Sequence, residues 1–166
     1  MSNGMTGQME ERIVQMASFR VGNEEYVIDI MRIKEIINPL KITPVPSSSE
    51  LIEGMINLRG VIIPIVDLRK RFRVPEEGWA KQPKYIIVAV SGRIVGIVVD
   101  EVLEVVRIPR DMIKPSPEIS QGREPGIFLG VCEHQGRLLL LVDLKKVLDP
   151  AFLSPFEGEK SGRQKG

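Results

Sequence analysis

The stretch GMINLRGVIIPIVDLRKRF, residues 54–72, lies without a gap on GVCEHQGRLLLLVDLKKVL, residues 130–148. Six of the 19 aligned positions are identical, and most of the others keep their apolar character. A weaker match places residues 17–37 on residues 86–106 and pairs Glu35 with Glu104. Because repetition along a chain indicates a repeated structural unit, the sequence predicts two copies of one small unit.

The apolar runs of each copy predict strands more than helices. Ile and Val together number 38 while Ala numbers only 4, and β-branched side chains favour pleated strands. Strands are predicted at residues 13–21, 26–31 and 33–37. Residues 47–54 are predicted to form one capped helical turn, and Asp67 and Asp143 to cap short helices. Five short strands per copy favour a small closed barrel, so we predict a mainly β fold of two barrels.

The two barrels are expected to form one domain over residues 12–150. A unit of about 70 residues supplies only a marginal core, so the barrels should pack on each other and share a third apolar layer. The subdomains are predicted at about residues 12–82 and 83–150, and strand exchange between them is left open. Residues 1–11 and 151–166 are rich in polar residues and glycine and are expected to be flexible tails.

Composition argues against several classes of function. A formal net charge of +1 gives no uniform field for nucleic acid or an anionic membrane. One cysteine, Cys132, and one histidine, His134, cannot build a zinc site, so no metal and no cofactor is predicted. The sequence has neither a signal-peptide pattern nor an apolar run of about 20 residues, which favours a cytoplasmic protein.

The chemically reactive residues do not assemble into a catalytic pattern. Cys132 is predicted to be a small buried hydrophobe and His134 an exposed turn residue. Asp100 and Glu101 are adjacent carboxylates that solvation explains. We therefore expect no enzyme. A small barrel that binds nucleic acid through the basic residues of 69–73 is kept as the alternative.

Residues that differ between the two copies are the better candidates for a binding site. In the turn at residues 57–60, the first copy has Arg59 where the second has Gln135. Gly60 and Gly136 are predicted to supply a positive φ, which would hold Arg59 near a barrel rim. A solvated surface arginine explains the same residue, and both interpretations stay open at this point.

Two further features belong to the first copy. Pro64 stands where the second copy has Leu140, and a proline within a strand indicates an open edge or a bulge because it has no N–H to donate. The isoleucines of residues 33–37 surround Glu35. Core packing and a docking surface are both compatible with this apolar cluster.

Four segments together resemble the CheW family, the adaptors of bacterial chemotaxis. They are NLRGVIIPIVDLRKRF at 57–72, EEYVIDIMRIKEII at 24–37, GRIVGIVVDEVLEVV at 92–106 and IKPSPE at 113–118. The resemblance covers about residues 12–150 in the order found in the family. It implies two five-stranded SH3-like barrels packed on a shared core, in agreement with the repeat.

The resemblance also implies a function and a set of contact residues. CheW-like proteins are non-catalytic and couple the cytoplasmic tips of chemoreceptors to the CheA histidine kinase, within receptor arrays at the membrane. A groove between the barrels would take a receptor helix. By match to family positions, receptor binding is expected at Ile33, Asn57 and Arg59. Kinase binding is expected at Glu35, Ile36, Glu118 and Ile119, although the family often has phenylalanine where this chain has Ile119.

Overall fold

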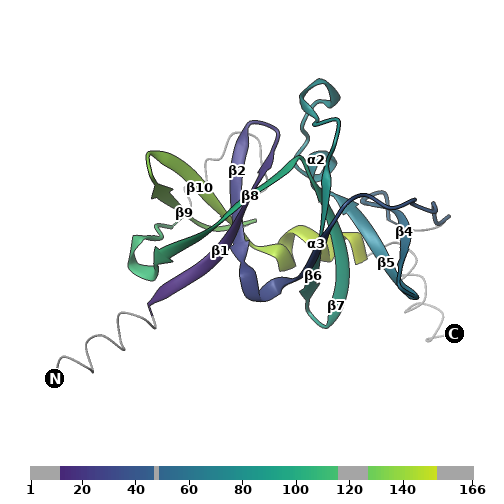
Figure 1. The fold of residues 1–166 in the computed structure, drawn as a ribbon, viewed down its shortest axis with the longest axis horizontal. Helices are drawn as coiled ribbons and strands as arrows, with labels where there is room; N and C mark the ends of the chain where they lie inside the picture. Colours follow the sequence, from purple (N-terminus) through teal and green to yellow (C-terminus); the bar gives the residue numbers. More distant parts are fainter. Residues whose placement is uncertain (1–11, 47–48, 116–126, 153–166) are drawn as a thin grey trace, which may run out of the picture.

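The computed structural model describes residues 12–46, 49–115 and 127–152. Over these ranges the chain is mainly β, as predicted (Figure 1). The strands are β1 (Ile13–Val21), β2 (Glu24–Asp29), β3 (Ile33–Ile37), β4 (Ile52–Leu58), β5 (Val61–Asp67), β6 (Lys84–Val90), β7 (Arg93–Val99), β8 (Glu101–Pro109), β9 (Phe128–His134) and β10 (Arg137–Val142). The helices are η1 (Ile30–Arg32), α2 (Leu68–Arg71), η2 (Glu76–Gly78), η3 (Arg110–Met112) and α3 (Leu144–Phe152).

The strands form two five-stranded sheets of the same design. One has the order β8-β1-β2-β10-β9 and the other the order β3-β6-β7-β5-β4. We call these units the β1 barrel and the β6 barrel. Each sheet contains an antiparallel hairpin, β1–β2 or β6–β7. The second strand of the hairpin also pairs in parallel with a further strand, β2 with β10 and β7 with β5. The predicted duplication into two five-stranded units is therefore confirmed.

Each sheet takes its hairpin from one copy and its other three strands from the other copy. β3 pairs with β6, and its equivalent β8 pairs with β1. Each sheet thus takes strands from both sides of residues 82–83. We interpret the two halves of the chain as units that are tied together by this exchange.

The shared core lies between the sheets, where Figure 1 shows α3. Four aromatic rings pack in its interior, with centroids 4.9–6.4 Å apart: Phe19, Tyr26, Phe72 and Phe128. Helix α3 buries one face in it through Leu144, Val147, Leu148 and Ala151. Each barrel also has a smaller apolar cluster of its own. The predicted third layer is therefore present, and burial of whole aromatic and aliphatic side chains at about 1.5–3 kcal/mol each explains why the barrels stay together.

Several turn and cap residues behave as the repeat predicts. Gly60 and Gly136 have φ of 87° and 76°, which glycine adopts at little cost. Asp67 accepts a hydrogen bond from the N–H of Arg69 at 2.9 Å, and so caps α2. Asp143 accepts a longer one from the N–H of Lys146 at the start of α3.

Three local predictions are wrong for reasons of tertiary structure. The helical turn predicted at residues 47–54 is shorter than expected: the carbonyl of Ser49 accepts from the N–H of Ile52 at 3.0 Å and its hydroxyl caps the N–H of Leu51 at 3.2 Å, but β4 begins at Ile52 and pairs with β5. Strand β2 ends at Asp29, whose carboxylate caps η1 through the N–H of Met31. Pro64 is not on an edge strand, because β5 lies between β7 and β4; it precedes the first β5–β7 pair, at Ile65.

The prediction that solvation explains Asp100 is also wrong. Its side chain is fully buried and accepts hydrogen bonds from the N–H of Gly22 at 2.6 Å and of Ala80 at 2.7 Å. The guanidinium of Arg69 lies 3.8 Å away, held mainly by Asp67 at 2.8 Å. One carboxylate therefore joins the β1–β2 turn, the linker before β6 and helix α2.

Two of the four basic residues after Asp67 are buried. Arg69 is only 8% exposed and stacks its guanidinium on Trp79, 4.2 Å from the ring centroid. Arg71 is 9% exposed and donates to the carbonyl of Val147 at 3.0 Å. Lys70 and Arg73 are exposed, and Lys70 is paired with Glu53 at 2.8 Å. The cluster on which the nucleic-acid alternative rested therefore keeps two of its four side chains at the surface.

Candidate interaction site

The turn between β4 and β5 holds Arg59 in an unusual backbone conformation. Arg59 and Gly60 both have positive φ, 51° and 87°, which is the pattern of a two-residue hairpin turn that matches strand twist. The side-chain oxygen of Asn57 accepts a hydrogen bond from the N–H of Gly60 at 2.8 Å. Asn57 thus stabilises the turn, and the turn places Arg59 at its tip.

Arg59 forms an ion pair with Glu35, 24 residues earlier on β3. Its guanidinium donates a hydrogen bond to the carboxylate, and this bond raises the pKa of Arg59. β3 and β4 are the two outer strands of the β6 sheet, so the pair joins its two ends. The Arg59 side chain is still 69% exposed. An exposed ion pair of this kind adds little to the free energy of folding. Its main effect is to orient the Arg59 guanidinium, which has five N–H donors and can bind a second acceptor.

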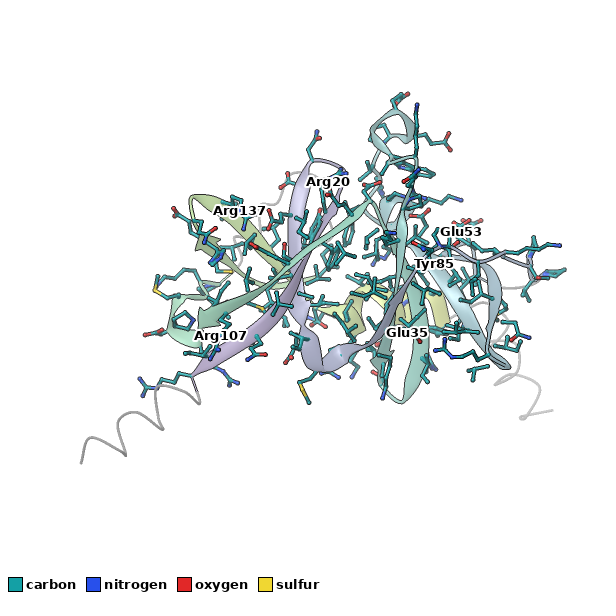
Figure 2. All side chains as sticks on the ribbon, in the orientation of Figure 1. Arg20, Glu35, Glu53, Tyr85, Arg107 and Arg137 are labelled. Carbon is teal, nitrogen blue, oxygen red and sulfur yellow. The ribbon has the colours of Figure 1, made fainter. Side chains whose placement is uncertain are left out.

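Apolar side chains are exposed on the same barrel. They are Ile36, Val61, Ile62 and Ile94, exposed by 42–60%. Ile36 follows Glu35 directly and therefore lies on the opposite face of β3. Figure 2 shows Glu35 on the barrel that holds β5 to β7. The β6 barrel thus offers an oriented cation together with separate apolar contact points.

The structure brings only some of the expected contact residues together. Glu35 and Arg59 are paired, and Asn57 lies in the same turn. Ile33 is half-buried and packs against the shared core. The expected kinase-contact residues Glu118 and Ile119 lie outside the described residues.

Sequence comparison of the two copies missed a second ion pair. Glu104, the equivalent of Glu35, accepts a hydrogen bond from Arg137 at 2.5 Å, and Arg137 also lies 3.4 Å from Glu25. Arg137 is two positions beyond Gln135, the residue aligned with Arg59. The hydrogen bond with Glu104 raises its pKa. A search for a basic residue within two positions of the turn would have found it.

The two arginines nevertheless differ in their surroundings. Arg137 lies at the start of β10, its side chain is 39% exposed, and it has two carboxylate neighbours. Arg59 lies at a turn tip with one carboxylate neighbour. Figure 2 shows Arg137 on the β1 barrel, away from Glu35. Arg59 is therefore the more available of the two for a partner.

The described ranges contain the one cysteine and the one histidine of the chain. No group of three or more His, Cys, Asp or Glu side chains there could hold a metal ion. Cys132 is 2% exposed, and burial raises the pKa of its thiol, so the reactive thiolate is disfavoured. None of the helices in these ranges is long and apolar enough to span a membrane.

Comparison with known proteins gives a consistent result. A family model described as the CheW-like domain matches residues 15–152. The chemotaxis protein CheW of Klebsiella aerogenes is 37% identical over 130 residues, which is 78% of each chain. The CheW of Bacillus subtilis is 36% identical over 135 residues, 81% of this chain and 86% of that one.

A solved structure is similar as well. The crystal structure of the scaffolding protein TtCheW from Thermoanaerobacter tengcongensis superposes with a TM-score of 0.74 at 32% identity. The match covers 81% of this chain and 87% of that one. Similarity therefore extends over both barrels.

Proposed function

The chain belongs to the CheW-like family, and from this membership we propose that it is a non-catalytic adaptor of chemotaxis. It couples chemoreceptor cytoplasmic tips to the CheA histidine kinase and is recruited by these contacts to receptor arrays at the membrane. The observation that carries the proposal is Arg59, which the turn and Glu35 hold in a fixed direction at an exposed tip of the β6 barrel.

The receptor contact is proposed at the β4–β5 turn. Arg59 supplies charge-assisted donors that suit a carboxylate or helix carbonyls of the receptor tip. Asn57 acts through the turn, because its side-chain oxygen already accepts from Gly60. Ile33 lies where η1 ends and β3 begins. It packs against the shared core and so supports the position of β3.

The kinase contact is proposed on the exposed face of β3. Ile36 is 44% exposed and supplies an apolar anchor of the kind that dominates binding energy at interfaces. Glu35 is the preceding residue, on the other face of β3, and is paired with Arg59. Glu118 and Ile119 complete the proposed contact on the strength of the family resemblance alone. Since the regulatory domain of CheA is itself CheW-like, we propose that the two pack barrel to barrel.

Arg59→Ala tests the receptor contact. The variant should keep its circular dichroism spectrum and thermal midpoint, because the side chain is exposed, while its affinity for a receptor-tip fragment falls by about tenfold or more. Arg137→Ala is the matched control, since it removes the equivalent ion pair on the β1 barrel and should bind as the parent does. Equal binding by Arg59→Ala and the parent would refute the receptor site.

Ile36→Glu tests the kinase contact separately. It should weaken binding to the CheA regulatory domain by about tenfold or more while leaving receptor-tip binding in place. The control is Ile62→Glu, which introduces the same charge at an exposed isoleucine on β5. If both variants bind the kinase domain equally well, β3 is not the contact.

A further inference from the structure

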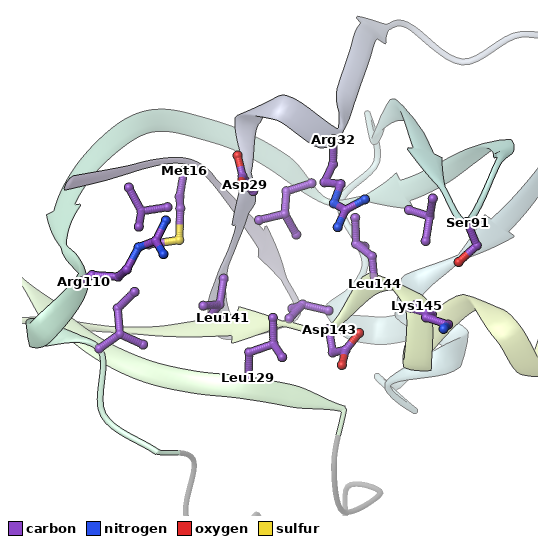
Figure 3. Close-up of a pocket in the computed structure, with 15 residues that line it drawn as sticks. Met16, Asp29, Arg32, Ser91, Arg110, Leu129, Leu141, Asp143, Leu144 and Lys145 are labelled. Carbon is purple, nitrogen blue, oxygen red and sulfur yellow. The ribbon is translucent and has the colours of Figure 1, made fainter. Parts of the chain in front are cut away.

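A cavity of about 370 Å³ opens beside the shared core, at one end of the β1 barrel (Figure 3). Apolar side chains from β1, β2, β9, β10 and α3 form most of its lining, with Val90 and Ser91 of the β6–β7 turn at one side. Neither Ile33 nor Arg59 lines it. The cavity is therefore separate from the residues proposed above to bind the receptor.

Charged side chains surround the cavity from three elements. The cations are Arg32 of η1, Arg110 of η3 and Lys145 of α3, and Figure 3 shows the two arginines reaching toward it from different sides. Among the described residues, these three side chains form no hydrogen bond or ion pair. The two carboxylates of the rim are already engaged as caps, Asp29 on η1 and Asp143 on α3. The groups that they cap are neutral N–H groups, so both carboxylates stay charged, and the rim of three cations and two carboxylates has a net charge of +1.

The β6 barrel has different side chains at the equivalent positions. Continuing the two repeat alignments by one residue places Met16 on Tyr85 and Leu129 on Glu53. Tyr85 is 5% exposed and packs within the cluster of that barrel, and Glu53 is paired with Lys70 at 2.8 Å. A bulky ring and a carboxylate thus stand where the β1 barrel has a flexible thioether and an exposed leucine. These two lining positions therefore differ in chemistry between the copies.

We propose that this cavity is a second docking site, which takes one large apolar side chain from an acidic segment of a partner protein. The apolar lining accepts the side chain, and the three cations face carboxylates on either side of it. The apolar lining continues out of the cavity to Leu129, which is 59% exposed. A ligand that lies wholly inside the cavity would leave this outer apolar surface uncovered. This outer surface favours a protein segment over a small amphiphilic anion.

Synthetic peptides and the methyl-labelled full chain test this site. The probe is a 12-residue peptide with a central Phe flanked by Glu, and its matched controls replace the Glu residues with Lys or the Phe with Ala. The Glu–Phe peptide should shift the methyl signals of Ile113, Leu129 and Leu141, whereas those of Val61 and Ile62 stay in place. Its affinity should exceed that of either control by about tenfold or more and should fall as NaCl is raised.

Charge reversal separates this site from general electrostatics. The double variant Arg32→Glu, Arg110→Glu should lose the shifts, while Arg107→Glu, an exposed arginine of β8 outside the cavity, should keep them. Three outcomes would overturn the proposal: equal shifts with the Lys–Phe peptide, shifts that persist in the double variant, or binding of decanoate but of no peptide. Binding of a receptor-tip fragment by Arg59→Ala is unaffected by any of these results, so the two proposals fail independently.

Discussion

Replacing Asp100 tests whether a buried carboxylate joins the two barrels. Its side chain has no exposed surface and accepts the N–H groups of Gly22 and Ala80 at 2.6 and 2.7 Å. Gly22 lies in the β1–β2 turn of the β1 barrel, and Ala80 lies in the linker that leads to β6 of the other. Arg69, 3.8 Å away, adds a third attachment from α2.

The expected magnitude follows from the groups left behind. Asp100→Ala leaves two buried N–H groups without an acceptor, at about 1–3 kcal/mol each. Arg69 keeps Asp67 as its closer partner. Loss of the Asp100 charge therefore destabilises the fold less than breaking a buried ion pair that has no other partner. The free energy of unfolding should fall by about 3–5 kcal/mol, a large part of the 5–15 kcal/mol that is usual for a domain.

Urea denaturation followed by circular dichroism measures this loss. Asp100→Asn keeps one acceptor oxygen and should lose about half as much as the alanine variant. Glu101→Ala is the control, because that side chain is 55% exposed and its contact with Arg20 at 3.4 Å lies at the surface. An Asp100→Ala variant within about 1 kcal/mol of the parent would refute the role of this carboxylate.

Three further results are expected. A methyl group at Gly130 would lie 2.6 Å from the carbonyl oxygen of Lys114. Gly130→Ala should therefore lower the free energy of unfolding by about 2 kcal/mol or more. Gly136→Ala is the control and should cost about 1 kcal/mol, because a methyl group there meets no atom within 4 Å. Burial, together with the charge of Asp67, raises the pKa of the Tyr85 hydroxyl in the folded protein. Above about pH 10 the hydroxyl is therefore deprotonated more readily in the unfolded chain than in the folded one, and the free energy of unfolding falls. Between about pH 9 and 11 the urea midpoint of Tyr85→Phe should fall less than that of the parent. Cys132, 2% exposed, should react with an aromatic disulfide reagent only as fast as the chain opens, and rapid reaction of the native protein would contradict its burial.

The duplicated devices of the fold were predictable because each is local. A glycine three residues after Asn57 or Glu133 fixes its own turn, and an aspartate before Leu68 or Leu144 caps its own helix. Such signals need no knowledge of the neighbouring strands. The predicted strand count per unit and the shared core followed from them.

The errors concern residues whose partners are distant in sequence. Asp100 was assigned to solvent from its neighbour Glu101, yet its acceptor role depends on Gly22, 78 residues away. Pro64 was assigned to an edge, yet β5 lies between β7 and β4 because its last residues pair with β7. Arg137 was overlooked because a gapless alignment compares backbone positions, whereas a long side chain reaches Glu104 from two positions away.

The pair of barrels also indicates where function resides. Both barrels have a Glu–Arg pair that involves an outer strand, β3 or β8, so such a pair by itself belongs to the fold. What differs is the position of the arginine: Arg137 lies within a strand beside two carboxylates, whereas Arg59 lies at a turn tip and stays exposed. The barrel interiors differ in the same way, since Tyr85 packs within one and Met16 borders an open cavity in the other. The two barrels share one fold but differ at the β4–β5 turn and at the position of Met16 and Tyr85. They therefore offer partners two chemically distinct surfaces.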